Sequence, residues 1–301
     1  MSSIHVANLS KRFGDTTAVR DISFTIKKSE IVGFVGPNGA GKTTTIALLL
    51  GFLRATKGEI KLLNRHTITP ETAHRSHKHI GYVAGDMTLF DGITGEQYLK
   101  FMANQFGIDE KVRQRLDARL NPQLDKKLKT LSRGNKQKIS LIAALQHDPE
   151  LIIMDEPTSG LDPLMQETFL NIIREEAARG ATVFMSSHIL SEVAEVCTRV
   201  MFMKKGRIVS DQATTDLQKN AGKLIHISAG SEQIKTLISS VPDDATIIYK
   251  SASRLTLRYD TNIQPALRWL STKNFDDLQI VDRKLDDLFI DLYKEEEVTP
   301  S

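Results

Sequence analysis

A glycine-rich segment between two apolar runs contains the residues best suited to chemistry. Within residues 31–50, IVGFVGPNGAGKTTTIALLL, the pattern G-x-x-x-x-G-K-[ST] is matched by Gly36, Gly41, Lys42 and Thr43. Backbone N–H groups of such a loop surround phosphate oxygens, and the helix that begins near Lys42 points its positive end at them. We expect Lys42 to reach the β- and γ-phosphates of a nucleotide and the Thr43 hydroxyl to ligate Mg²⁺. A flexible turn with an exposed lysine is the less specific alternative.

Two acidic residues end a second apolar run. Residues 151–154, LIIM, predict a buried strand, and Asp155 and Glu156 follow it directly. Carboxylates at the carboxyl end of a parallel strand lie where α/β sheets bind ligands. Asp155 therefore suits a Mg²⁺ ligand, and Glu156 suits a base that orients an attacking water. An ordinary acidic turn is the alternative, and the phosphate loop upstream weakens it.

Two further segments have weaker signals. Residues 131–145, LSRGNKQKISLIAAL, predict a polar turn that opens a helix, whose N-terminus either binds an anion or is simply capped. Residues 182–185 predict a buried strand that Ser186, Ser187 and His188 follow. Because this strand should neighbour the strand that ends at Asp155, we expect His188 near a terminal phosphate or the attacking water. A cap or surface histidine is the more ordinary interpretation.

Strands and helices are predicted around these motifs. Alternating or apolar runs indicate strands at residues 4–9, 22–26, 58–63 and 80–84. Thr94 is the predicted N-cap of a helix, and the helical pattern continues to about residue 128. Phe13, between the first two strands, is either a hairpin or core aromatic or a ring that stacks on a nucleotide base.

A change of pattern near residue 220 predicts a second domain. Its expected order is strand, helix, strand, strand, helix, strand, as in a split-βαβ, ferredoxin-like sandwich. We expect a first domain over residues 1–219, an accessory α+β domain over residues 220–294 and a frayed tail over residues 295–301. The segment LDDLFIDLY has the pattern of a short amphipathic helix. A stabilising appendage and a regulatory or dimer-contact domain remain alternatives.

Composition limits the classes of function. The 301 residues include 40 Lys and Arg against 37 Asp and Glu, an excess too small to predict a nucleic-acid partner. Cys197 is the only cysteine, which excludes an intrachain disulfide and favours a reducing compartment. The N-terminus lacks the apolar core of a secretion signal, and no apolar run approaches the roughly 18 residues that cross a bilayer. Work at a membrane would therefore require another polypeptide that crosses it.

Taken in order, the motifs resemble those of the ATP-binding subunits of ABC transporters. The resemblance covers about residues 4–216 and rests on GPNGAGKT for the phosphate loop, LSRGN for the signature, LIIMDE for the Walker B strand, SGLD for the D-loop and His188 for the switch histidine. It implies an α/β P-loop NTPase domain with an antiparallel β subdomain and a helical subdomain at about residues 86–147. The G-x-K-Q-K continuation and the C-terminal extension are similar to the ABC-2 exporter branch, which carries drugs, antibiotics or bacteriocins.

The resemblance also implies cofactors, partners and residue roles. ATP and Mg²⁺ would be bound, with Glu156 as base and His188 as γ-phosphate sensor. The implied nucleotide-binding residues are Phe13, Gly36, Pro37, Asn38, Gly39, Ala40, Gly41, Lys42, Thr43, Thr44, Ser132, Gly134 and Asp162. Ser132 and Gly134 of one subunit would meet the ATP held by Lys42 of a second ATP-binding subunit, either another copy or a relative. Closure on ATP would move a separately encoded, multi-spanning permease from the cytoplasmic face of the cell membrane.

Two departures from the family pattern affect the expected site. Gly85 stands where the family has a glutamine or glutamate that contacts Mg²⁺ and water, and we expect Asp86 to supply that oxygen instead. In the signature, Arg133 and Asn135 replace the usual glycine and glutamine. Arg133 either adds positive charge near the phosphate or faces solvent.

Two other functions remain open at this point. A soluble ABC ATPase that acts on ribosomes or DNA usually has two nucleotide-binding units or a long coiled-coil insertion, and the sequence indicates neither. A regulatory subunit that binds ATP but scarcely hydrolyses it would be consistent with Gly85. We expect the ATPase of an exporter, whose substrate would be chosen by the permease.

Overall fold

The protein folds as two compact units, Met1–Gln212 and Ala213–Ser301. The computed structural model describes residues 2–64, 68–85, 92–260, 263–283 and 286–287. The unit boundary precedes helix α8 (Thr214–Asn220), whereas the sequence pattern predicted it between residues 219 and 220, in the last turn of that helix. Each unit is described by itself.

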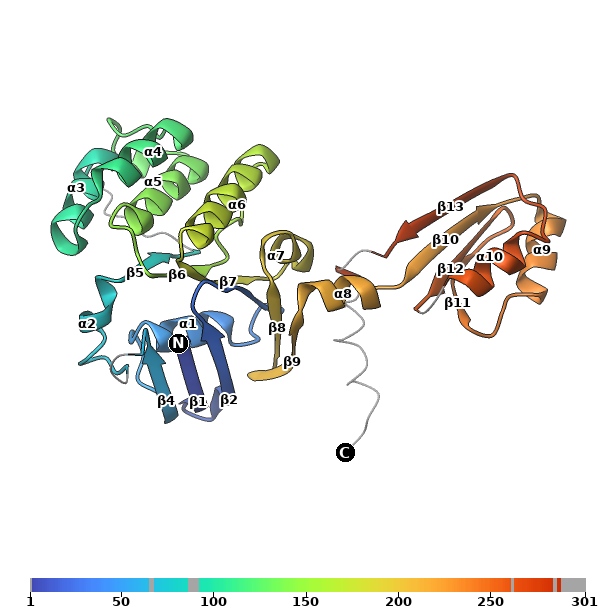
Figure 1. The fold of residues 1–301 in the computed structure, drawn as a ribbon, viewed down its shortest axis with the longest axis horizontal. Helices are drawn as coiled ribbons and strands as arrows, with labels where there is room; N and C mark the ends of the chain where they lie inside the picture. Colours follow the sequence, from blue (N-terminus) through green and yellow to red (C-terminus); the bar gives the residue numbers. More distant parts are fainter. Residues whose placement is uncertain (1, 65–67, 86–91, 261–262, 284–285, 288–301) are drawn as a thin grey trace. The chain divides into compact units, whose positions relative to one another are not determined.

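A six-stranded sheet lies at the centre of the first unit (Figure 1). Its order is β5 (Ile80–Val83), β6 (Leu151–Asp155), β7 (Thr182–Ser187), β3 (Ile31–Val35), β8 (Arg199–Lys204) and β9 (Arg207–Ala213). The pairs from β5 through β8 are parallel. Every residue of β3, β6 and β7 is buried, as expected for parallel strands covered on both faces. Asp155 pairs with Ser186, which confirms that the strand ending at Asp155 and the strand preceding His188 are neighbours.

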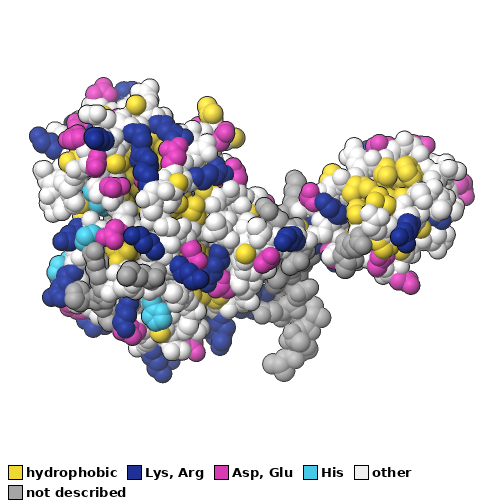
Figure 2. All heavy atoms as spheres, in the orientation of Figure 1, with side chains coloured by type: hydrophobic (Ala, Val, Ile, Leu, Met, Phe, Trp, Pro, Cys, Tyr) yellow, Lys and Arg dark blue, Asp and Glu magenta, His cyan; other side chains and the backbone are white. Residues whose placement is uncertain are grey.

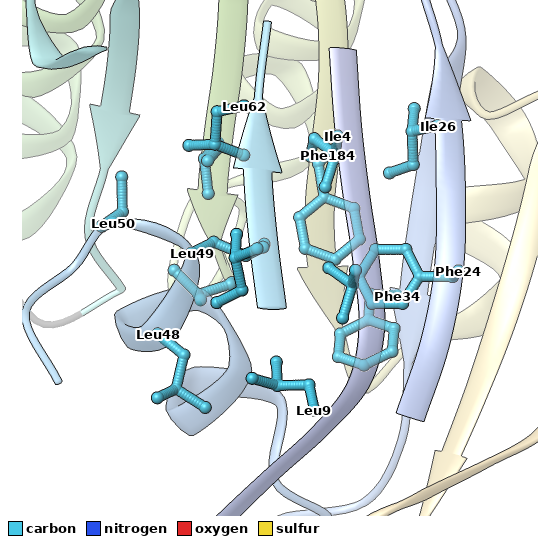
Figure 3. Close-up of a cluster of buried hydrophobic side chains, with 14 of the residues drawn as sticks. Ile4, Leu9, Phe24, Ile26, Phe34, Leu48, Leu49, Leu50, Leu62 and Phe184 are labelled. Carbon is cyan, nitrogen blue, oxygen red and sulfur yellow. The ribbon is translucent and has the colours of Figure 1, made fainter. Parts of the chain in front are cut away.

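A three-stranded antiparallel sheet packs over the first helix. Its order is β2 (Thr16–Lys27), β1 (Ser2–Phe13) and β4 (Lys57–Leu62). Figure 3 shows Ile4 and Leu62 of this sheet facing a core shared with Leu49 of α1 (Lys42–Leu49) and with Phe34 and Phe184 of the central sheet. This core therefore fixes the start of α1 relative to the carboxyl ends of β3 and β7.

Helices surround the central sheet. They are α2 (His74–His77), α3 (Gly95–Phe106), α4 (Glu110–Leu120), the 3-10 turn η1 (Leu128–Thr130), α5 (Arg133–Leu145), α6 (Pro163–Ala178) and α7 (Leu190–Val196). Helices α3, α4 and α5 pack together in the region expected to be helical (Figure 1). Thr94 is the predicted N-cap of α3 and forms a capping box with Gln97. Among the described residues, no helix combines the length and apolar character that a membrane span requires.

The described part of the second unit begins with helix α8 and continues with a four-stranded antiparallel sheet and the helices α9 and α10. The sheet order is β11 (Ala245–Lys250), β12 (Arg254–Tyr259), β10 (Lys223–Ser228) and β13 (Asp277–Asp282). Helices α9 (Ser231–Ser239) and α10 (Gln264–Leu270) contribute Ile234, Leu237, Ala266 and Leu270 to its core. After α8, the described elements follow the order βαββαβ. Most of the segment LDDLFIDLY and the whole tail lie outside the described residues.

Candidate functional site

The glycine-rich loop joins β3 to α1 and surrounds a pocket. Residues 37–44 line this pocket together with Ala18 and Glu156. Gly41 has φ +110°, and a Cβ there would lie 2.4 Å from the Ala18 carbonyl oxygen, so only glycine fits. Because α1 begins at Lys42 without a side-chain cap, the N–H groups of its first turn are available to an anion. The loop therefore has the geometry of a phosphate-binding site.

Lys42, Glu156 and His188 form a continuous chain of charged and polar contacts. The Lys42 side chain is only 4% exposed, and its ammonium donates to the carbonyl oxygens of Gly36, at 2.6 Å, and Pro37, at 3.3 Å. Its Nζ also lies 3.3 Å from Glu156 Oε1. The second carboxylate oxygen, Oε2, lies 3.0 Å from His188 Nδ1. The structure thus brings the three predicted catalytic residues together around one carboxylate.

Ser186 fixes both acidic residues at the end of β6. Its hydroxyl donates to the Asp155 carboxylate, and its carbonyl oxygen accepts from the Glu156 N–H at 3.2 Å. Glu156 has φ 45°, in the left-handed region, which turns its side chain at the strand end. Ser186 and Ser187 belong to β7 itself, so this strand is two residues longer than the sequence pattern suggested. Only His188 follows the strand.

A second pocket adjoins the phosphate loop and contains the expected metal ligands. Thr43 and Asp155 line it, with Gly85, Tyr82 and Arg133. Burial, together with the nearby Asp155 charge, raises the pKa of Tyr82 to about 12, so its hydroxyl remains protonated at neutral pH. The described residues include no cluster of three His, Cys, Asp or Glu side chains that could enclose a metal. One hydroxyl and one carboxylate suit Mg²⁺, which usually takes its remaining ligands from water and phosphate.

Glu156 lines three different pockets. It lines the phosphate-loop pocket, the pocket with Thr43 and Asp155, and a third pocket that includes Ser159, Gly160 and His188. Ligands in different pockets of this site would therefore share one carboxylate as a possible contact.

The other predicted site residues occupy different positions. Phe13 ends β1 with 47% of its surface exposed, and the Lys11 ammonium lies 4.8 Å from its ring centre. Ser132 is the N-cap of α5 and Gly134 lies in the first turn of that helix. Asp162 is the N-cap of α6, accepting from the Met165 N–H at 2.9 Å. These four are not among the residues that line the three pockets, and Asp86 lies outside the described residues.

Several pocket residues were not expected from the sequence. Ala18 comes from β2, and no local pattern distinguishes it from other strand residues. Ser159 accepts a hydrogen bond from Arg133 at 3.2 Å, so the signature segment and the D-loop segment contact each other within one chain. Arg133 lines the pocket with Asp155 and is also exposed, so both of its expected roles stay predictions.

Comparisons with known proteins agree on one family. The family model described as "ABC transporter" matches residues 19–159. An uncharacterized ABC transporter ATP-binding protein of Bacillus subtilis, YhcH, is 36% identical over 71% of this chain and 70% of its own. The linearmycin resistance ATP-binding protein LnrL of the same species is 34% identical over 73% of this chain and 72% of its own. The dimeric ATP-binding cassette MJ0796, solved with ADP and phosphate, shares the fold at a TM-score of 0.64 and 20% identity, covering 70% of this chain and 98% of its own.

Proposed function

The chain belongs to the family of ABC transporter ATP-binding proteins and is an ATPase, and from this premise we propose that it drives a separate membrane permease that exports its substrate. The observation that supports hydrolysis most directly is the contact of one carboxylate, Glu156, with both Lys42 and His188 beside the phosphate loop. Export is supported by the similarity to a linearmycin resistance protein. A peripheral position on the cytoplasmic face of the membrane follows from this proposal.

In the proposed mechanism, ATP phosphates occupy the loop at the start of α1. The Lys42 ammonium then contacts the phosphate oxygens in place of Glu156, because an anion in the loop competes for the same ammonium. Glu156, released from that ion pair, accepts a proton from the attacking water, and His188 holds its second oxygen. Mg²⁺, when bound by Thr43 and Asp155, would neutralise charge on the phosphates.

A second ATP-binding subunit would complete the site. Ser132 and Gly134 stand at the exposed start of α5, away from the residues that line the phosphate pocket of their own chain. A helix N-terminus of this kind suits an anion presented from outside. We propose that it meets ATP held by a second copy, an arrangement supported by the dimeric state named for the similar cassette MJ0796.

An apolar groove beside the site is the proposed contact for the permease. It lies between the end of α1, β5 and helices α3 and α5, and Phe52, at 58% exposed, forms part of its wall. Tyr82 and Ala84 line both this groove and the pocket of Asp155. An occupant of the groove would therefore contact the same residues that shape the nucleotide pocket.

The proposal predicts what copurifies with the chain. When the tagged protein is extracted in mild detergent from the cells in which it occurs, we expect a multi-spanning membrane protein in fixed stoichiometry, identified by mass spectrometry. Phe52→Asp should reduce its recovery by about tenfold or more, because it places a charge in an apolar contact. Val209→Asp, an exposed apolar residue of β9 outside the groove, is the matched control and should retain the partner.

Two results would contradict the permease proposal. One is recovery of the wild-type chain with ribosomal or DNA-bound proteins and no membrane protein, which would favour the soluble ABC ATPase. The other is equal loss of the partner from both variants, which would place the contact elsewhere.

Glutamine, the residue that the family usually has at this position, is not expected to be tolerated in place of Gly85. A Cβ at Gly85 would lie 2.7 Å from the Asp155 carbonyl oxygen, a backbone atom that cannot move without displacing the Asp155 side chain. We therefore expect Gly85→Gln to lower ATP turnover by about tenfold rather than restore the family's glutamine, and to destabilise the fold by about 1–3 kcal/mol. Turnover and thermal unfolding would be measured together. Gly92→Ala, where an added Cβ meets no atom within 4 Å, should change neither. Higher activity of Gly85→Gln would show that this strand end has room for the side chain.

A further inference from the structure

The sheet of the second unit has two edge strands with different charge patterns. The edges are β11 and β13, because the sheet order is β11-β12-β10-β13. An edge strand presents a row of backbone groups that can pair with another strand, and charged residues commonly prevent this. β13 has an aspartate at each end, Asp277 and Asp282. β11 instead has Asp243 and Asp244 before it and Lys250 at its end.

β11 is also exposed and apolar. All residues from 246 to 250 are exposed, including Ile247 at 37%, Ile248 at 51% and Tyr249 at 55%. A bulge between Ile247 and Tyr249 adds Ile248 to the strand. Figure 2 shows hydrophobic side chains gathered on the visible face of this unit. An exposed, apolar edge of this kind is a place where chains associate.

We propose that β11 pairs antiparallel with β11 of a second copy of this chain, joining two four-stranded sheets across a twofold axis. With Ile247 on the axis, Asp244 of each copy lies opposite Lys250 of the partner subunit. The strand is thus complementary to itself, and the ion pair forms twice. Ile248 and Tyr249 lose their contact with water in the same interface.

Charge selects this arrangement over two others. A parallel pairing of β11 with itself would set Asp244 beside Asp244 and Lys250 beside Lys250. Antiparallel pairing of β13 with itself would set Asp277 opposite Asp282 of the partner subunit. Of these three pairings, the antiparallel pairing of β11 is the one that combines apolar burial with opposite charges, so a second copy is the occupant that this edge fits.

The inference goes beyond the proposed ATP-driven pairing of cassettes, because β11 pairing needs no nucleotide. Two chains joined through their accessory sheets would keep their phosphate loops at a high effective concentration between rounds of ATP binding. The test is therefore made without nucleotide, and its outcome is independent of whether the chain drives a permease.

The experiment measures the mass of the purified full-length chain by light scattering during size-exclusion chromatography in nucleotide-free buffer. We expect twice the 33.6 kDa of one chain. Ile248→Lys should yield the monomer. Lys250→Asp and Asp244→Lys should each raise the dimer dissociation constant by about tenfold, because opposite charges become like charges at two symmetric positions. The double variant Asp244→Lys with Lys250→Asp should recover the dimer, since the pair is inverted rather than removed.

Controls separate loss of pairing from loss of folding. Ile280→Lys changes an apolar residue of the other edge, β13, with 36% exposure, and should remain dimeric. Far-UV circular dichroism should be unchanged in all variants. A monomeric wild-type chain, a dimeric Ile248→Lys variant, or failure of the double variant to recover the dimer would each overturn the proposal.

Discussion

Glu156→Gln is expected to lower ATP turnover by about two to four orders of magnitude, the usual contribution of a positioned general base. Glutamine has nearly the same shape and keeps the left-handed backbone of this position, so the change removes mainly the proton-accepting charge. Contacts of Lys42 with the loop carbonyls do not involve Glu156, and ATP binding should therefore persist. Steady-state phosphate release and equilibrium nucleotide binding would be measured on the same samples.

The matched control for this variant is Glu150→Gln. Glu150 immediately precedes β6, at the end opposite to Asp155, and pairs with His79 at 3.1 Å. Its replacement should leave turnover unchanged. If the wild-type rate is low and Glu156→Gln does not reduce it, the chain is a regulatory subunit that binds ATP and scarcely hydrolyses it, and the proposed role of Glu156 is wrong.

Lys42→Met is expected to weaken ATP binding by about tenfold to a hundredfold, the range for loss of a hydrogen bond from a charged group. Methionine fills much of the same buried volume, but it donates nothing to the carbonyl oxygens of Gly36 and Pro37 or to a phosphate. Turnover should fall with binding, since the same change removes the ion-pair partner of Glu156. Titration with a fluorescent ATP analogue would measure the dissociation constant.

A second lysine tests whether the effect of Lys42→Met is local. Lys28 lies on the exposed turn after β2, and Lys28→Met should bind ATP as the wild type does. Thermal unfolding of both variants without nucleotide would reveal any general loss of stability. Unchanged ATP affinity of a folded Lys42→Met chain would contradict the assignment of the loop as the phosphate site.

Local sequence patterns predicted the parts of the site that local structure determines. The glycine-rich loop, the buried strand before Asp155 and the helix that starts after Ser132 each depend on a few consecutive residues. Strand lengths were less predictable. β1 continues to Phe13, well beyond the expected residue 9, because its irregular pairing with β2 extends to the hairpin. A local sequence pattern does not show which residues will pair across two strands, so it could not predict this extension.

Contacts between distant segments could not be predicted in detail. The sequence placed Asp155 and His188 at the ends of neighbouring strands, which was correct, but it did not indicate that Ser186 would hold both acids. Nor did it reveal that the Asp155 carbonyl oxygen approaches Gly85 too closely for a side chain. Both facts depend on the pairing of β5, β6 and β7 with one another, which joins segments far apart in the sequence.

The position of Glu156 at the junction of three pockets has a thermodynamic consequence. A ligand that prefers one orientation of this carboxylate would change the free energy of binding at the other two pockets for ligands that also prefer one orientation. Linkage requires that the effect be mutual, so a group that enters beside Ser159 and raises the affinity for phosphate must itself be held more tightly when phosphate is present. The Glu156 side chain can thus couple the ligand affinities of the three pockets, and the coupling is the same in both directions.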